Sequence, residues 1–69
     1  MLVSTKGNWA AGMRQAQANA NASNVPWIVF MYGGHHVFCE RATEADMAGT
    51  SGKVRDGGQI VEPQPIEVE

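Results

Sequence analysis

WIVFMYGGHHVFCE, residues 27–40, is the stretch of sequence that decides the fold. It consists of two β-rich runs joined by the glycine pair 33–34. A two-residue turn of type I′ needs positive φ at both central positions, and glycine adopts positive φ without steric cost. The stretch therefore predicts a β-hairpin in which Ile28 lies opposite Cys39.

This predicted register gives the hairpin two apolar faces, because successive side chains of a strand point to opposite sides. One long helix can cover only one of these faces. The first face carries Ile28, Phe30, Tyr32, His35, Val37 and Cys39, and the second carries Trp27, Val29, Met31, His36, Phe38 and Glu40.

Residues 8–22, before the hairpin, predict that helix. An apolar stripe recurs along them at helical spacing, and its alanines allow close packing onto a sheet. Asn8 is a candidate N-cap, as are Ser4 and Thr5, and Asn24 tolerates the left-handed conformation that ends helices. The stripe consists of Trp9, Met13, Ala16 and Ala20.

The chain after the hairpin predicts a helical turn and a short strand. Thr43 is the expected N-cap of the turn, Asp46 holds the capping-box position, and Gly49 ends it. Residues 50–53 are expected to be loop, and residues 59–62, QIVE, a third strand.

The predicted fold class is therefore α+β, with one N-terminal amphipathic helix packed on a small antiparallel sheet. The sheet consists of the central β-hairpin and the short third strand. A single domain over residues 1–62 would precede an extended, acidic, proline-containing tail at residues 63–69.

Composition narrows the function classes. The chain has 69 residues and one cysteine, Cys39, so it forms no internal disulfide and suits a reducing, cytoplasmic compartment. Its longest apolar run, residues 27–32, is too short for a membrane helix. A net charge of −2 predicts no binding to nucleic acid. All seven acidic residues lie from Glu40 onward, an arrangement that favours solubility or attracts a basic partner.

Reactive residue types near the hairpin turn raise the question of a metal or thiol site. His35 and Cys39 are about 13 Å apart along a regular strand, and His36 points to the opposite side. We therefore expect no catalytic residues, no cofactor and no metal within one chain, and hence no enzyme. The alternative is a small metal- or thiol-dependent protein that uses His36, Cys39 and Glu40, with a metal shared between two protomers as one form of it.

The uncovered hairpin face instead predicts association, because exposed apolar patches of this kind usually mark an interface. The expected function is a non-enzymatic protein-binding module, a homodimer or the binder of a larger partner. By analogy with small inhibitors encoded by phages and mobile elements, it would be a regulator or inhibitor that occludes the partner's site. The expected interface residues are Trp27, Val29, Met31 and Phe38, with His36 at the rim.

Overall fold

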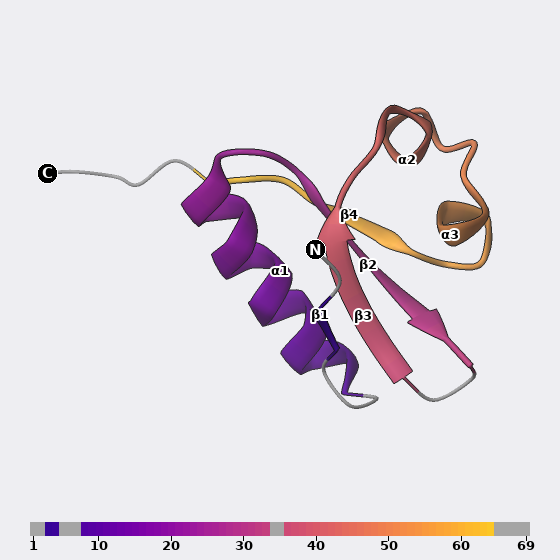
Figure 1. The fold of residues 1–69 in the computed structure, drawn as a ribbon, viewed down its shortest axis with the longest axis horizontal. Helices are drawn as coiled ribbons and strands as arrows, with labels where there is room; N and C mark the ends of the chain where they lie inside the picture. Colours follow the sequence, from indigo (N-terminus) through magenta and orange to yellow (C-terminus); the bar gives the residue numbers. More distant parts are fainter. Residues whose placement is uncertain (1–2, 5–7, 34–35, 65–69) are drawn as a thin grey trace, which may run out of the picture.

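A computed structural model describes residues 3–4, 8–33 and 36–64 of the chain. Its elements are β1 (Val3–Ser4), α1 (Trp9–Ser23), β2 (Trp27–Tyr32), β3 (His36–Arg41), α2 (Glu44–Ala48), α3 (Gly52–Arg55) and β4 (Gln59–Val61). The strands form one antiparallel sheet in the order β1-β3-β2-β4. Helix α1 lies on one side of this sheet, and the short helices α2 and α3 lie on the other (Figure 1). The predicted α+β fold, a helix on an antiparallel sheet with a hairpin, is confirmed.

Two asparagines cap the ends of α1, as the sequence predicts. The Asn8 side chain accepts a hydrogen bond of 3.0 Å from the Ala11 backbone N–H. At the other end, Asn24 adopts a left-handed conformation with φ of 57°, and its N–H donates to the Ala20 carbonyl at 2.7 Å. Both contacts satisfy backbone groups that have no partner within the helix.

The predicted turn after the hairpin is the short helix α2, closed by a capping box. The Thr43 hydroxyl accepts from the Asp46 N–H at 3.2 Å, and the Asp46 carboxylate accepts from the Thr43 N–H at 2.9 Å. The prediction of a loop at residues 50–53 is wrong for residues 52–53, because helix α3 begins at Gly52. Ser51 caps this helix by accepting a 3.3 Å hydrogen bond from the Val54 N–H.

The hairpin is present, but its predicted register is wrong by one residue. Tyr32 pairs with His36, so the turn spans three residues rather than two. Cys39 therefore lies opposite Val29 and not opposite Ile28. Three-residue turns are also common in hairpins. Gly33, the first residue of this turn, has φ of 71°, a left-handed conformation that glycine adopts without steric cost. Residues 34 and 35 lie outside the described part of the chain.

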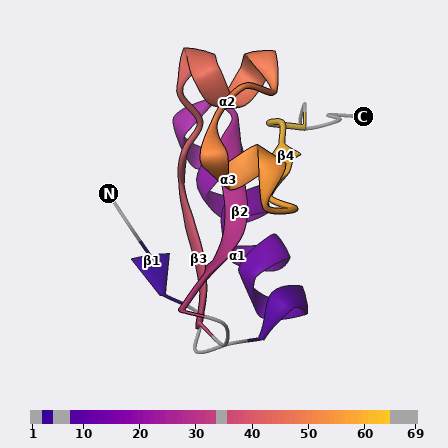
Figure 2. The same cartoon turned by 90° about the vertical axis from the view of Figure 1, so that its right-hand side faces the viewer.

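The observed register places one set of hairpin side chains in the core beneath α1. Trp27 at the start of β2 remains 7% exposed, and its indole Nε1–H donates to the Ser23 hydroxyl at 3.0 Å. Two alanines of α1, Ala16 and Ala20, are fully buried, and their small side chains allow the helix to lie close to the strands (Figure 2). This core consists of Ala16, Ala20, Trp27, Val29, Val37, Cys39 and Val61, with Trp9, Met13 and Val25 packed against it.

The two ends of the described chain are tied to the rest. Val3 in β1 pairs with Cys39 and adds a strand that the sequence did not predict. The predicted third strand is β4, which pairs with β2. After it, the Gln64 N–H donates to the Asn21 side chain at 2.8 Å. Of the tail predicted at residues 63–69, residues 65–69 lie outside the described part.

In the described part of the chain, no helix combines the length and the apolar character needed to cross a bilayer.

Candidate functional site

Aromatic side chains gather on the sheet face opposite α1. We define the aromatic patch as Phe30, Tyr32, His36 and Phe38. The observed register places Phe30 opposite Phe38 and Tyr32 opposite His36. The Phe38 ring is central, with its centroid 5.9 Å from that of Phe30, 6.4 Å from that of Tyr32 and 6.2 Å from that of His36. Aromatic pairs at this spacing contribute about 0.5–1.5 kcal/mol beyond the burial of their area.

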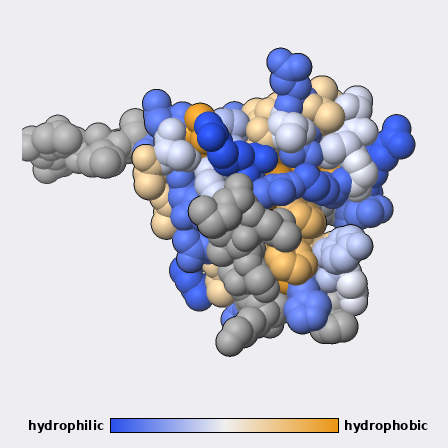
Figure 3. All heavy atoms as spheres, viewed as in Figure 1, coloured by the Kyte–Doolittle hydropathy of each residue, from blue (hydrophilic) through white to orange (hydrophobic). Residues whose placement is uncertain are grey.

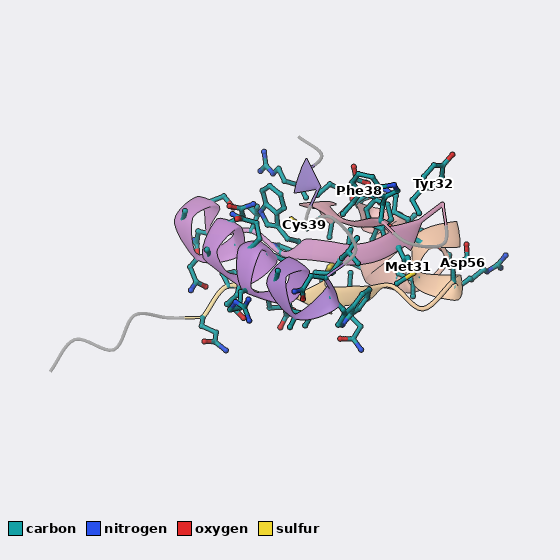
Figure 4. The ribbon with its side chains drawn as sticks, turned by 90° about the horizontal axis from the view of Figure 1, so that it is seen from below. Met31, Tyr32, Phe38, Cys39 and Asp56 are labelled. Atoms are coloured by element: carbon teal, nitrogen blue, oxygen red, sulfur yellow. The ribbon has the colours of Figure 1, made fainter. Side chains whose placement is uncertain are left out.

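Exposure increases across the patch from its base to its rim. Phe30 is 8% exposed, Phe38 is partly buried, and Tyr32 is 71% exposed. Figure 4 shows Tyr32 and Phe38 projecting on the side of the sheet away from α1. Tyrosine has an apolar ring and a polar hydroxyl, so a solvent-facing Tyr32 suits contact with another molecule.

A pocket of about 400 Å³ adjoins the aromatic patch. Its polar residues come from α3, from the C-cap position after α3 and from β3, and its apolar residues come from β2. The Lys53 ammonium pairs with the Glu40 carboxylate and lies 5.3 Å from the centroid of the Phe30 ring, a cation–π contact. The pocket is lined by Phe30, Met31, Tyr32, Glu40, Lys53 and Asp56.

Close backbone packing holds α3 in this position. The Gly58 N–H donates to the Lys53 carbonyl at 2.8 Å. A Cβ atom at Gly58 would lie 2.6 Å from that same oxygen and 3.2 Å from the Ile28 side chain. Only glycine therefore allows this approach, which sets Lys53 over Phe30. The sequence prediction missed this wall of the pocket because α3 was expected to be partly loop.

The predicted interface does not form one surface. Trp27 and Val29 lie beneath α1, with 7% and 0% of their surface exposed. His36 and Phe38 project from the other face, so grouping them with the first two residues was wrong. The physical reason is the three-residue turn, which shifts one strand by a residue and thereby exchanges its faces. Contact of Met31, His36 and Phe38 with a partner stays a prediction.

Cys39 lies in the core beneath α1. Its side chain is fully buried, and the Asn19 amide lies 4.0 Å from its sulfur. Burial raises the pKa of the Cys39 thiol, and the Asn19 contact opposes this only in part. A thiol in this environment is a poor nucleophile and a poor metal ligand.

The residues of the metal or thiol alternative are not brought together. His36 and Glu40 share the face of the aromatic patch, whereas Cys39 faces α1. Among residues 3–4, 8–33 and 36–64, no group of three or more His, Cys, Asp or Glu side chains is arranged to hold a metal ion.

Asp46 is a buried carboxylate with a structural explanation. It is 1% exposed, and this burial raises its pKa. The nearby Ser51 side chain and the Thr43 backbone and side chain outweigh burial, so the pKa of Asp46 lies below its ordinary value, although its Oδ1 atom has no hydrogen-bond partner among the described residues. The charged form is thus held in place as part of the α2 capping box.

Comparison of the chain with protein-family models, with curated proteins and with solved structures finds no match. Its function is therefore inferred from the aromatic patch and the adjoining pocket.

Proposed function

We propose that this chain is a non-enzymatic protein-binding module, a small regulator or inhibitor that covers a site on a larger partner protein. The aromatic patch and the pocket form its docking surface. The observation that carries the proposal is Tyr32, which is 71% exposed beside a hollow of about 400 Å³. Aromatic side chains are enriched at protein interfaces, where they supply much of the binding energy.

Packing on the two sheet faces supports this use of the patch. Helix α1 fills one face with core contacts. On the other face, α3 covers Phe30 with Lys53 but leaves Tyr32 in solvent. A partner that covered Tyr32 and the outer part of Phe38 would remove apolar area from water at about 25 cal/mol per Å².

A different protein fits this surface better than a second copy of the chain. A stable protein interface buries about 800 Å² on each partner. Burial of Trp27 and Val29 beneath α1 removes two of the five residues predicted for a homodimer interface. Hydrophilic side chains cover most of the described surface in the view of Figure 3. In the described part of the chain, the large hydrophobic side chains with high exposure are Met31, Tyr32 and Met47.

The test compares two substitutions of exposed hydrophobic side chains. Tyr32→Ser alters the patch, and Met47→Ser alters α2, where 46% of the methionine is exposed. A partner is first captured from the source cell with the wild-type chain, then identified and purified. We expect titration calorimetry to give about tenfold weaker binding with Tyr32→Ser and unchanged binding with Met47→Ser.

Two outcomes would contradict the proposal. Binding that survives Tyr32→Ser while circular dichroism confirms a folded variant would place the docking surface elsewhere. Sedimentation of the wild-type chain as a stable dimer that Tyr32→Ser dissociates would assign the patch to a second copy instead.

A further inference from the structure

The outer edge of β2 lacks a neighbouring strand next to the pocket. β4 pairs with β2 only as far as Val29, which lies opposite Gln59. Beyond that pair β2 continues through Met31 to Tyr32. Within the described residues, this end of β2 therefore has a strand on its β3 side only.

Hydrogen-bond alternation indicates which peptide groups face this edge. The Ala42 N–H donates to the Pro26 carbonyl at 3.0 Å, in register with the hairpin. Groups of an antiparallel strand point alternately to its two neighbours, so even-numbered residues of β2 bond toward β3. Odd-numbered residues then point the other way, and the Met31 N–H and C=O lie beyond the end of β4. Such an edge is a template for an added strand.

The charges of the pocket favour a cationic side chain. Of its three charged residues, Lys53 is already paired with Glu40 and packed over Phe30. Asp56 adds a second carboxylate, so the lining carries one net negative charge. Met31 and Asp56 line the same hollow, and Figure 4 labels both side chains. An acidic side chain would meet two carboxylates and a lysine that is already neutralised.

We propose that the open edge of β2 binds an extended segment of the partner protein, which adds as a strand beside Met31 and places an arginine or lysine side chain in the pocket. The aliphatic stem would lie against Met31 and Tyr32, and the cationic head would reach Asp56. Long basic side chains combine an apolar stem with a charged end, which matches this lining. The proposal rests on the proposed function and adds the chemistry of the partner.

The test uses short β-forming peptides as probes. Acetylated and amidated heptapeptides of alternating valine and threonine carry arginine, glutamine or glutamate at the centre. Each is titrated to millimolar concentration into the ¹⁵N-labelled chain, and amide shifts are followed by NMR. We expect the arginine peptide to shift the Met31 amide and to bind about fivefold more tightly than the glutamine peptide, from one ion pair with Asp56.

Two matched variants test whether the preference for the arginine peptide over the glutamine peptide arises at the pocket. Asp56→Asn removes the carboxylate at the pocket and should abolish the advantage of arginine over glutamine. Glu62→Gln removes an exposed carboxylate just beyond β4, at the opposite end of β2, and should leave that advantage unchanged. Amide spectra of both variants establish that they are folded.

Three results would overturn the inference: equal binding of the glutamine or glutamate peptide, shifts that avoid Met31, or no saturable shift. These results leave the proposed function standing if a purified partner still discriminates Tyr32→Ser from Met47→Ser. Conversely, arginine-dependent binding at Met31 without any effect of Tyr32→Ser on a partner would refute the aromatic docking surface and retain the peptide edge.

Discussion

A disulfide between β2 and β3 provides a direct test of the hairpin register, which determines the residues that form the aromatic patch. Val29 lies opposite Cys39 in the observed register. Because even-numbered residues of β2 bond toward β3, this is a non-hydrogen-bonded pair, whose Cα atoms are about 4.5 Å apart. That spacing allows a disulfide. We therefore expect Val29→Cys to form an internal disulfide with Cys39.

Ile28→Cys is the matched control. Both positions are fully buried, but Ile28 pairs with Glu40 and its side chain points away from Cys39. A two-residue turn would reverse this relation and bring Ile28 opposite Cys39. The two variants therefore distinguish the two registers by which one forms the disulfide.

The expected gain follows from the loop that the disulfide closes. Closing a loop of about ten residues reduces the conformational entropy of the unfolded chain, which stabilises the folded chain by about 3 kcal/mol. Loss of valine packing costs about 1 kcal/mol, so oxidised Val29→Cys should exceed the wild type by about 2 kcal/mol in free energy of unfolding. Refolding from urea with oxidised glutathione, mass spectrometry and urea titration measure both quantities. A disulfide in Ile28→Cys, with none in Val29→Cys, would refute the observed register and the aromatic patch with it.

Three further predictions concern stability and reactivity. Cys39 should react slowly with a thiol reagent in the native chain, and rapid labelling of the folded protein would contradict its burial. Because burial raises the pKa of Cys39, its contribution to stability is full below about pH 8.5 and is lost as the pH rises further. Asp46→Asn should lower the free energy of unfolding by about 1 kcal/mol at neutral pH. Because the pKa of Asp46 is lowered, this difference from the wild type in urea titrations should shrink as the pH falls below about 4. A difference that does not depend on pH would show that the charged form of Asp46 does not stabilise the fold. Gly58→Ala should lower the free energy of unfolding by about 1–3 kcal/mol, because the added Cβ atom clashes with the Lys53 carbonyl. Gly52→Ala should be nearly neutral, because a Cβ atom there meets open space. Equal urea midpoints for the two variants would show that α3 does not depend on Gly58.

Elements that depend on local interactions were predictable from the sequence. The caps of α1 at Asn8 and Asn24 involve residues three or four positions away. The capping box of α2 likewise joins Thr43 to Asp46. These contacts form within one turn of chain, so residue type and spacing suffice to predict them.

The hairpin register was not predictable in this way. Gly33 can adopt its positive φ in a turn of two residues or of three, because glycine has no Cβ atom. The choice between them depends on packing between distant segments. The observed register places Val37 and Cys39 in the core beneath α1 and packs the Phe30 ring against that of Phe38. Alternation within each strand was read correctly, but the pairing of the strands requires the tertiary contacts.

The pocket depends on a contact that is equally non-local. Lys53 reaches Glu40 and Phe30 only because α3 is a helix and Gly58 lets it approach the sheet. This packing fixes the Lys53 side chain and the Phe30 ring before any partner arrives. Association costs about 0.5–1.5 kcal/mol for each flexible side chain that becomes immobilised. With Phe30 and Lys53 already held in place, the main ordering cost of binding falls on the exposed ring of Tyr32, which has only two rotatable side-chain bonds. The proposed docking surface on the sheet face opposite α1 would thus be preorganised except at Tyr32.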